Sequence, residues 1–146
     1  MNLRPAVLLI LPFLSVTGFA AEPDRMRDFF ESAEEVRRAG ETLEAKMPEA
    51  DCEAARVLLA DFMAVIEKYR DNPNTLISGN AYFSELAIYQ IRLAHIARRQ
   101  GQEADATRYE AEAIESCKKS GWSSCELSVL QRVVGEMNKS LRGKCF

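Results

Sequence analysis

Apolar residues recur every three or four positions through most of this chain, which is the spacing of amphipathic helices. Five segments show the pattern: about 26–47, 51–69, 80–99, 102–118 and 127–141. No segment alternates apolar and polar residues over the length of a strand, so no strand is predicted. We therefore expect an all-α fold. The apolar positions of the first segment are Met26, Phe29, Ala33, Val36, Leu43 and Met47, and Gly40 is a weak point within it.

Turn-forming residues separate the predicted helices. Pro48 ends the first helix at about Met47 or starts the second, and Asp51 is a suitable N-cap for the second. The run 70–80 is rich in Asn, Pro, Ser and Gly and is the longest predicted loop. The remaining boundary signals are the glycines that close the third and fourth helices, Gly101 and Gly121, and a capping-box pair before the fifth, Ser123 and Glu126.

The first 20 residues have the three-part form of a secretory signal peptide. A basic start at Arg4 is followed by a mainly apolar stretch and by small residues before a cleavage point after about Ala20. The apolar stretch is too short to span a bilayer, which takes about 20 residues. We therefore expect a periplasmic or secreted protein, with residues 21–146 as a single helical domain.

The expected export also bears on the state of the four cysteines, because disulfides persist in oxidising compartments. An even number in an exported chain predicts two disulfides, and the sequence lacks the C-x-x-C pairs typical of zinc sites, so we expect no metal and no cofactor. Short turns favour antiparallel neighbours, and the second helix, with a broad apolar face, is the candidate for the central one. Alternating directions favour Cys52–Cys145 and Cys117–Cys125 among three possible connectivities. The expected architecture is about five antiparallel helices in one disulfide-stapled bundle.

Composition and charge narrow the class of partner. Of the 146 residues, 47% are hydrophobic and 28% are charged, and the formal net charge of -3 becomes -4 if Arg4 leaves with the signal peptide. An acidic chain without a long basic run has no general attraction for nucleic acid or for an anionic membrane surface. We therefore expect a protein or peptide partner and no membrane span after cleavage. Oppositely charged pairs that indicate a solvated surface on the first helix are Arg27/Glu31, Glu34/Arg38 and Arg37/Glu41.

A stretch from about 87 to 118 has small residues where two helices of a hairpin would touch. The residues that carry this pattern are Leu93, Ala94, Gly101, Ala106 and Ala113. The pattern resembles one tetratricopeptide hairpin, although Tyr109 lies one position before the family's usual aromatic and no second copy occurs at a 34-residue spacing. The resemblance implies a helical hairpin, a short TPR-like helical array as an alternative to a bundle, and a peptide-binding groove.

Residues 78–82, Ser-Gly-Asn-Ala-Tyr, are similar to the S-G-x-x-Y motif of exported bacterial lysozyme inhibitors. That resemblance implies a loop inserted into a hydrolase cleft. The inhibitor family is a β-barrel, however, whereas this chain has a helical pattern. We therefore favour a cap and a turn that lead into the third helix.

Residues for catalysis are sparse. The single histidine, His95, shares a predicted helix face with Arg92 and Arg99, and such a stripe is suited either to an anionic ligand or to pairing with acids of the first helix. Oxidised cysteines cannot act as nucleophiles, and no glycine-rich phosphate loop or H-E-x-x-H motif is present. Two of the 22 acidic residues would suffice for a two-carboxylate hydrolase, but spacing in the sequence does not show which two would lie at a catalytic distance. We expect a protein that is not an enzyme.

Three aromatic residues are candidate binding residues. Trp122 lies between the last two helices, and Tyr82 and Phe83 follow the long loop. Each is suited to anchoring an interface or to covering an end of the core. The leading expectation is an exported, non-enzymatic interaction protein, with an inhibitor or immunity-type protein as a specific version of it. The alternatives are a small anionic-ligand carrier that uses Arg92, His95 and Arg99, and a two-carboxylate hydrolase.

Overall fold

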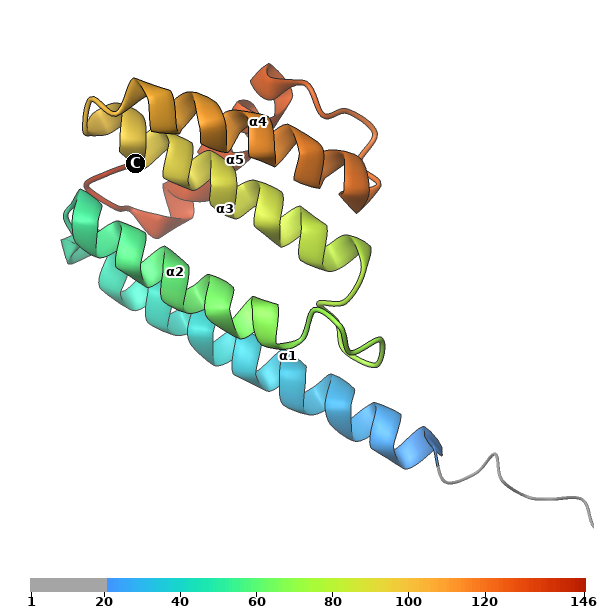
Figure 1. Cartoon of the computed structure of the whole chain (residues 1–146). Helices are drawn as coiled ribbons and strands as arrows, with labels where there is room; N and C mark the ends of the chain where they lie inside the picture. The colour runs from blue at the N-terminus through green and yellow to red at the C-terminus, as the bar shows by residue number, and fades with distance from the viewer. Residues whose placement is uncertain (1–20) are drawn as a thin grey trace, which may run out of the picture.

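The computed structural model describes residues 21–146, so the predicted signal peptide lies outside the described residues. This range contains five α-helices and no strand, as the hydrophobic pattern predicted (Figure 1). A short 3-10 turn, η1 (Met47–Glu49), follows the first helix. The helices are α1 (Ala21–Lys46), α2 (Cys52–Lys68), α3 (Asn80–Arg99), α4 (Glu103–Ser120) and α5 (Leu127–Leu141). None of these described helices is long and apolar enough to cross a membrane.

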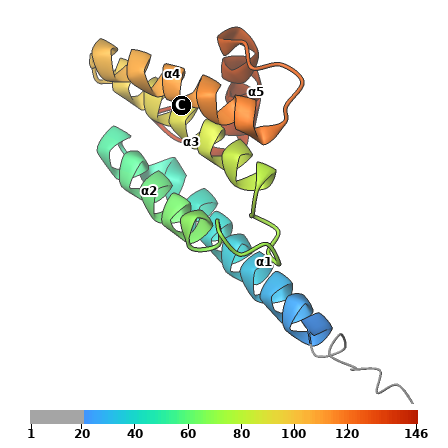
Figure 2. The same ribbon diagram turned by 45° about the vertical axis from the view of Figure 1, so that its right-hand side comes forward.

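The helices form two layers. α1 and α2 make one antiparallel hairpin, and α3 and α4 make a second that lies alongside it, with α5 packed against α3 (Figure 2). α3 contacts α2, α4 and α5, so the prediction that the second helix is the central one was wrong. The reason is that α3 buries residues all around its circumference, with small Ala87, Ala94 and Ala97 allowing close approach of its neighbours.

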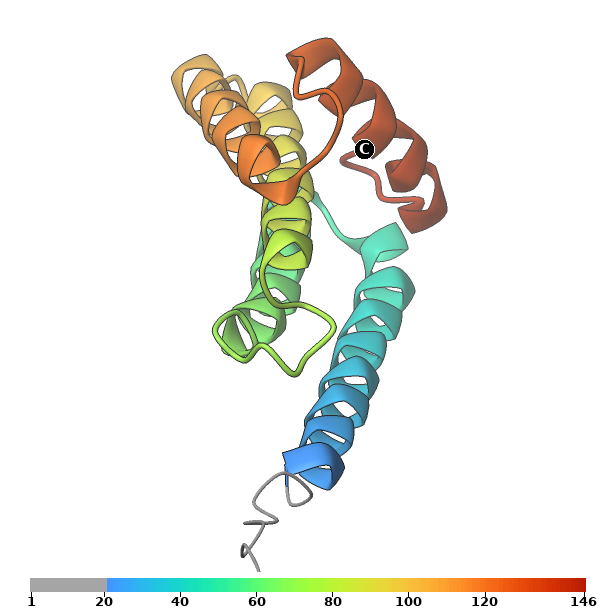
Figure 3. The same ribbon diagram turned by 90° about the vertical axis from the view of Figure 1, so that its right-hand side faces the viewer.

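The hydrophobic core has three parts. One covers the C-terminal end of α1, one lies among α3, α4 and α5, and one joins α2 to the start of α3. The largest fully buried side chains of the first two parts are Met47, Leu59, Ile96, Leu130 and Val134. α5 lies near the C-terminal end of α1, whereas the N-terminal half of α1 extends away from this packing (Figure 3).

The four cysteines form two pairs at disulfide distance. Cys52 at the start of α2 pairs with Cys145 near the C-terminus, with 5.2 Å between their Cα atoms. Cys117 in α4 pairs with Cys125 before α5, at 5.7 Å. These are the pairs that alternating helix directions favour.

Most helix boundaries follow the predicted signals, with one exception. Asp51 caps α2, because its Oδ1 accepts the backbone N–H of Ala54 at 2.8 Å. The capping box expected at Ser123 and Glu126 is absent: Glu126 itself is the N-cap residue, and no side chain caps the helix. Because Cys125 is bonded to Cys117, the preceding serines belong to the loop that this pair closes.

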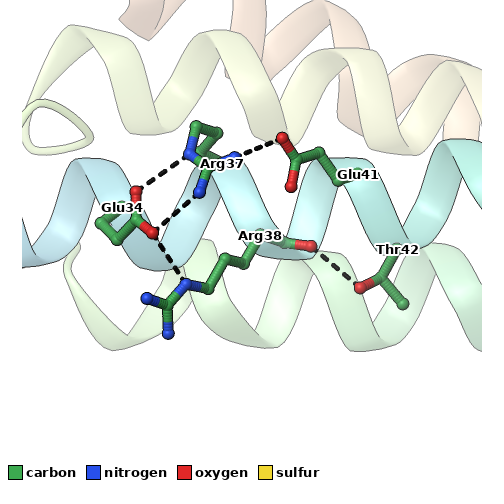
Figure 4. A network of polar contacts seen from close by, with 5 residues as sticks. All are labelled: Glu34, Arg37, Arg38, Glu41 and Thr42. Atoms are coloured by element: carbon green, nitrogen blue, oxygen red, sulfur yellow. Dashed lines mark hydrogen bonds and ion pairs between the residues drawn. The ribbon is translucent and has the colours of Figure 1, made fainter.

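The exposed face of α1 carries an ion-pair network (Figure 4). Arg37 and Arg38 both donate to the Glu34 carboxylate, and Arg37 also pairs with Glu41. These hydrogen bonds, first from Arg37 and then from Arg38, lower the pKa of Glu34 to about 2. The predicted partner of Arg27 was wrong, because it pairs with Asp24 and Asp28 instead of Glu31.

Candidate functional site

The predicted stripe on α3 does not converge on one ligand. Arg92 is buried, and its Nε donates to Oδ1 of Asn138 in α5 at 2.8 Å. His95 is exposed, with its ring 5.8 Å from the ring of Phe146, and Arg99 donates to the carbonyl of Lys144 at 3.3 Å. The three residues therefore face two different neighbours.

The environment of His95 does not favour its charged form. Neighbouring protein atoms displace part of the water around this exposed ring, which lowers its pKa, and the positive charge of Arg99 lowers it further, while a backbone hydrogen bond at Cys145 opposes the shift. A neutral imidazole adds nothing to the attraction of an anion. Arg92, in contrast, lines a cavity between helices.

This cavity, which we call the Arg92 groove, lies where α1, α2, α3 and α5 meet, and has a volume of about 260 Å³. Burial raises the pKa of Glu85, which also lines it, while the charge of Arg92 opposes that shift. Sequence reasoning missed Glu85, although it lies seven positions, or about two helical turns, before Arg92. Its wall includes Gly40, Leu43, Glu44, Phe62, Glu85, Arg92 and Leu141.

The candidate aromatic residues have different surroundings. Trp122 is half-buried against the core among α3, α4 and α5, and its Nε1 donates to Ser84 Oγ at 3.0 Å. Tyr82 is buried, and its hydroxyl donates to Glu67. Phe83 is half-buried and lines an open cavity of about 460 Å³ beside the long loop. All three side chains thus pack against the core, Tyr82 fully and Trp122 and Phe83 in part. Tyr82 and Phe83 also line the open cavity.

The structure also exposes an apolar surface that the sequence pattern placed in the core. Met26, Phe29 and Phe30 near the start of α1 are 57%, 39% and 61% exposed. We call these three residues the α1 tip. They line an open cavity of about 480 Å³ together with Arg25 of α1 and Pro73 and Asn74 of the long loop. A signal was present in the sequence: Phe30 lies outside the apolar repeat, where a large apolar residue has no core to enter.

The position of the long loop beside the α1 tip is fixed by a hydrogen bond. Asn72 Nδ2 donates to Asp28 Oδ2 at 3.2 Å, and Asn72 Oδ1 accepts the backbone N–H of Asn74. The rings of Phe29 and Phe30 meet edge to face, with centroids 5.7 Å apart. These contacts hold the long loop beside the first turns of α1.

No protein-family model, curated protein or solved structure matches this chain. Among residues 21–146, no group of three or more His, Cys, Asp or Glu side chains lies close enough to hold a metal ion. The α1 tip and the Arg92 groove are therefore the two candidate binding surfaces.

Proposed function

We propose that this chain is a non-enzymatic interaction protein that binds a protein partner through the α1 tip. The observation that carries the proposal is the exposure of Met26, Phe29 and Phe30 on neighbouring turns of one helix. A cluster of exposed large apolar side chains, rimmed by polar groups, is typical of a protein interaction site. Aromatic residues and Met are also enriched in the centres of such sites.

The charges around the α1 tip favour a protein over a membrane surface. Asp24 and Asp28 both pair with Arg27, and Arg25 also lines the cavity. These two acidic and two basic residues balance, so the α1 tip has no excess positive charge to attract anionic lipid headgroups. The whole chain is acidic, with a formal net charge of -3. A partner segment with apolar anchors that pack against the two Phe rings fits this surface.

The preformed geometry supports tight binding. Because the bond from Asn72 to Asp28 already holds the loop, association does not have to order it. Pro73, which lines the same cavity, restricts the backbone further. The partner would therefore meet a rigid wall on one side and a helix on the other.

We also propose that the protein acts in an oxidising, exported compartment, as the two cysteine pairs favour. An inhibitor or immunity-type role, in which the partner is a hydrolase of that compartment, is a specific version of the proposal. Periplasmic or secreted location rests on the predicted signal peptide in residues 1–20.

Affinity capture with a matched pair of variants tests the proposal. The oxidised protein serves as bait in envelope and secreted extracts of its source, beside Phe29→Ser/Phe30→Ser and a control, Val57→Ser, which changes an equally exposed residue of α2. We expect one protein to be retained by the wild type and by Val57→Ser and lost with the double variant. Identification of that protein as a hydrolase would favour the inhibitor version.

Several outcomes would contradict the proposal. Equal retention by all three baits would place the interface elsewhere. Co-sedimentation of the wild type, but not of Phe29→Ser/Phe30→Ser, with anionic vesicles would identify a membrane as the occupant. A concentration-dependent dimer that the double variant loses would identify a second copy of this chain. Circular dichroism of each variant checks that the fold is unchanged.

A further inference from the structure

The Arg92 groove combines a buried charge with an apolar wall. Arg92 is 8% exposed, yet no carboxylate oxygen of the described residues lies within 4.0 Å of its guanidinium. Its Nε donates to Asn138, and its two terminal nitrogens have no acceptor among the described residues. Because no described side-chain nitrogen is both fully buried and unpaired, these two nitrogens reach the solvent of the groove, where a ligand carboxylate can pair with them.

A carboxylate is well matched to this guanidinium. The bond from Nε to Asn138 holds the planar group in one orientation, which leaves its terminal nitrogens available. A carboxylate pairs with two parallel guanidinium N–H groups, and the charge-assisted bonds are stronger than neutral ones. The groove thus has one well-defined end for a carboxylate group.

Acidic residues of the groove argue against a purely anionic ligand. Glu85 of α3 and Glu44 of α1 both line it, so a phosphate or a simple carboxylate would meet two negative charges beside one positive charge. Glu85 and Arg92 influence each other's pKa but do not form an ion pair, so a gap separates them. A ligand that carries a positive group next to its carboxylate would span that gap and satisfy both side chains.

Gly40 explains why the groove is open. A Cβ atom at this position would lie 3.8 Å from a ring carbon of Phe62, in ordinary contact. Any longer side chain would therefore extend over Phe62 and occupy the space. The glycine that weakens the middle of α1 thus leaves room against Phe62, Leu43 and Leu141.

We propose that the Arg92 groove binds a small zwitterion with an aliphatic side chain, of the class of leucine or methionine. The ligand's carboxylate pairs with Arg92, its ammonium group with Glu85, and its side chain packs against Leu43, Phe62 and Leu141. The cavity volume of about 260 Å³ suits an amino acid better than a larger cofactor. This binding is independent of the partner proposed for the α1 tip.

Calorimetric titration of the full oxidised protein with L-leucine tests this inference. The comparison ligands are 4-methylpentanoate, which lacks the ammonium group, and isopentylamine, which lacks the carboxylate. We expect L-leucine to bind with a dissociation constant below about 1 mM, and each single-charge analogue to bind at least about tenfold more weakly. If 4-methylpentanoate binds as well as L-leucine, the groove is an anion site and the inference fails.

Two variants and a control make the test specific. Glu85→Gln should weaken L-leucine binding about tenfold and strengthen 4-methylpentanoate binding, because the repelling charge is gone. Gly40→Met should remove binding by filling the space over Phe62 while keeping the charges and favouring the helix. The control Arg99→Gln, on the same helix but outside the groove, should leave binding unchanged.

Three further results would also overturn the inference. One is no heat of binding from leucine, methionine, valine or phenylalanine up to about 10 mM. Another is retained binding in a folded Gly40→Met protein, because the ligand would then lie elsewhere. The third is an equal response of both ligands to Glu85→Gln.

Discussion

The two halves of α1 carry the same apolar repeat but have opposite surroundings. In the C-terminal half, Leu43 and the adjoining Met47 are enclosed by α2, by the end of α3 and by the C-terminal residues near Leu141. In the N-terminal half, Met26 and Phe29 face solvent, because this part of the helix extends past its neighbours (Figure 1). The difference shows that a repeat specifies a helix, whereas other segments decide whether its apolar side is covered.

The largest effect should come from releasing the C-terminal segment that covers the buried half. Replacing both cysteines in Cys52→Ser/Cys145→Ser opens a loop with a sequence separation of 93, for which the chain-entropy model gives a loss of about 4–5 kcal/mol in the free energy of unfolding. Urea denaturation measures the loss.

The second cysteine pair provides the control. Cys117→Ser/Cys125→Ser opens a separation of only 8, for which the same model gives about 2–3 kcal/mol. Equal losses for the two pairs would mean that the long closure contributes nothing beyond the short one.

A matched pair of alanine substitutions compares the two halves directly. Leu43→Ala removes side-chain atoms from the core and should cost about 2–5 kcal/mol. Met26→Ala removes exposed atoms and should change stability by no more than about 0.5 kcal/mol. Thermal denaturation of the two variants checks this. A cost above about 1 kcal/mol for Met26→Ala would show that the α1 tip is packed in solution.

A smaller loss in the free energy of unfolding is expected for a substitution in α5, which packs near the buried half of α1 and provides the hydrogen-bond acceptor of Arg92. Asn138→Leu removes the oxygen that accepts from Arg92 Nε and should cost about 1–3 kcal/mol, because a buried donor is left unpaired. Ser140→Ala, an exposed change on the same helix, is the control. A neutral Asn138→Leu would indicate that Arg92 finds another acceptor, such as Glu85.

The smallest effects should come from two carboxyl groups in contrasting surroundings. Glu34, on the exposed face of α1, has a pKa of about 2, so its contribution to stability is present above pH 4.5 and is lost as the pH falls toward 2. Glu85 has a raised pKa, so its contribution is present below pH 4.5 and is lost as the pH rises through its folded pKa.

Carbon-13 NMR titration of the side-chain carboxyls measures both values. We expect Glu34 to titrate well below the ordinary value of 4.5 and Glu85 above it. Glu85→Gln should accordingly stabilise the protein at neutral pH but not below pH 4.5. If both carboxyl groups titrate at the same pH, the predicted difference between their pKa values is wrong.

Local signals were the most reliable guide to the fold. The helix segments, the Asp51 cap and the left-handed turn at Gly121 depend on a few adjacent residues, and all were predicted. The capping box before α5 failed, and the serines that were expected to form it lie in the loop closed by the bond between Cys117 and Cys125. The capping preferences of single residues do not take such a covalent constraint into account.

The candidate sites depended more on tertiary packing. Helical spacing correctly put Arg92, His95 and Arg99 on one strip of α3, but α5 covers the first and the C-terminal segment meets the other two. The aromatic candidates separate for a similar reason, since Tyr82 is buried and Phe83 is not. Residues on one face of a helix can therefore contact different neighbouring segments and need not form one site.

The sequence by itself determined the five helices, their turns and the pairs in which the cysteines meet, because periodicity, capping and alternating direction are properties of neighbouring residues. Only the tertiary structure decided that α3 is central, that the α1 tip is exposed and that Arg92 and Glu85 share a groove. Those features depend on which surfaces are covered. Whether a helix surface is buried depends on the lengths and crossing angles of helices that are distant in the chain. A pattern of neighbouring residues does not specify these.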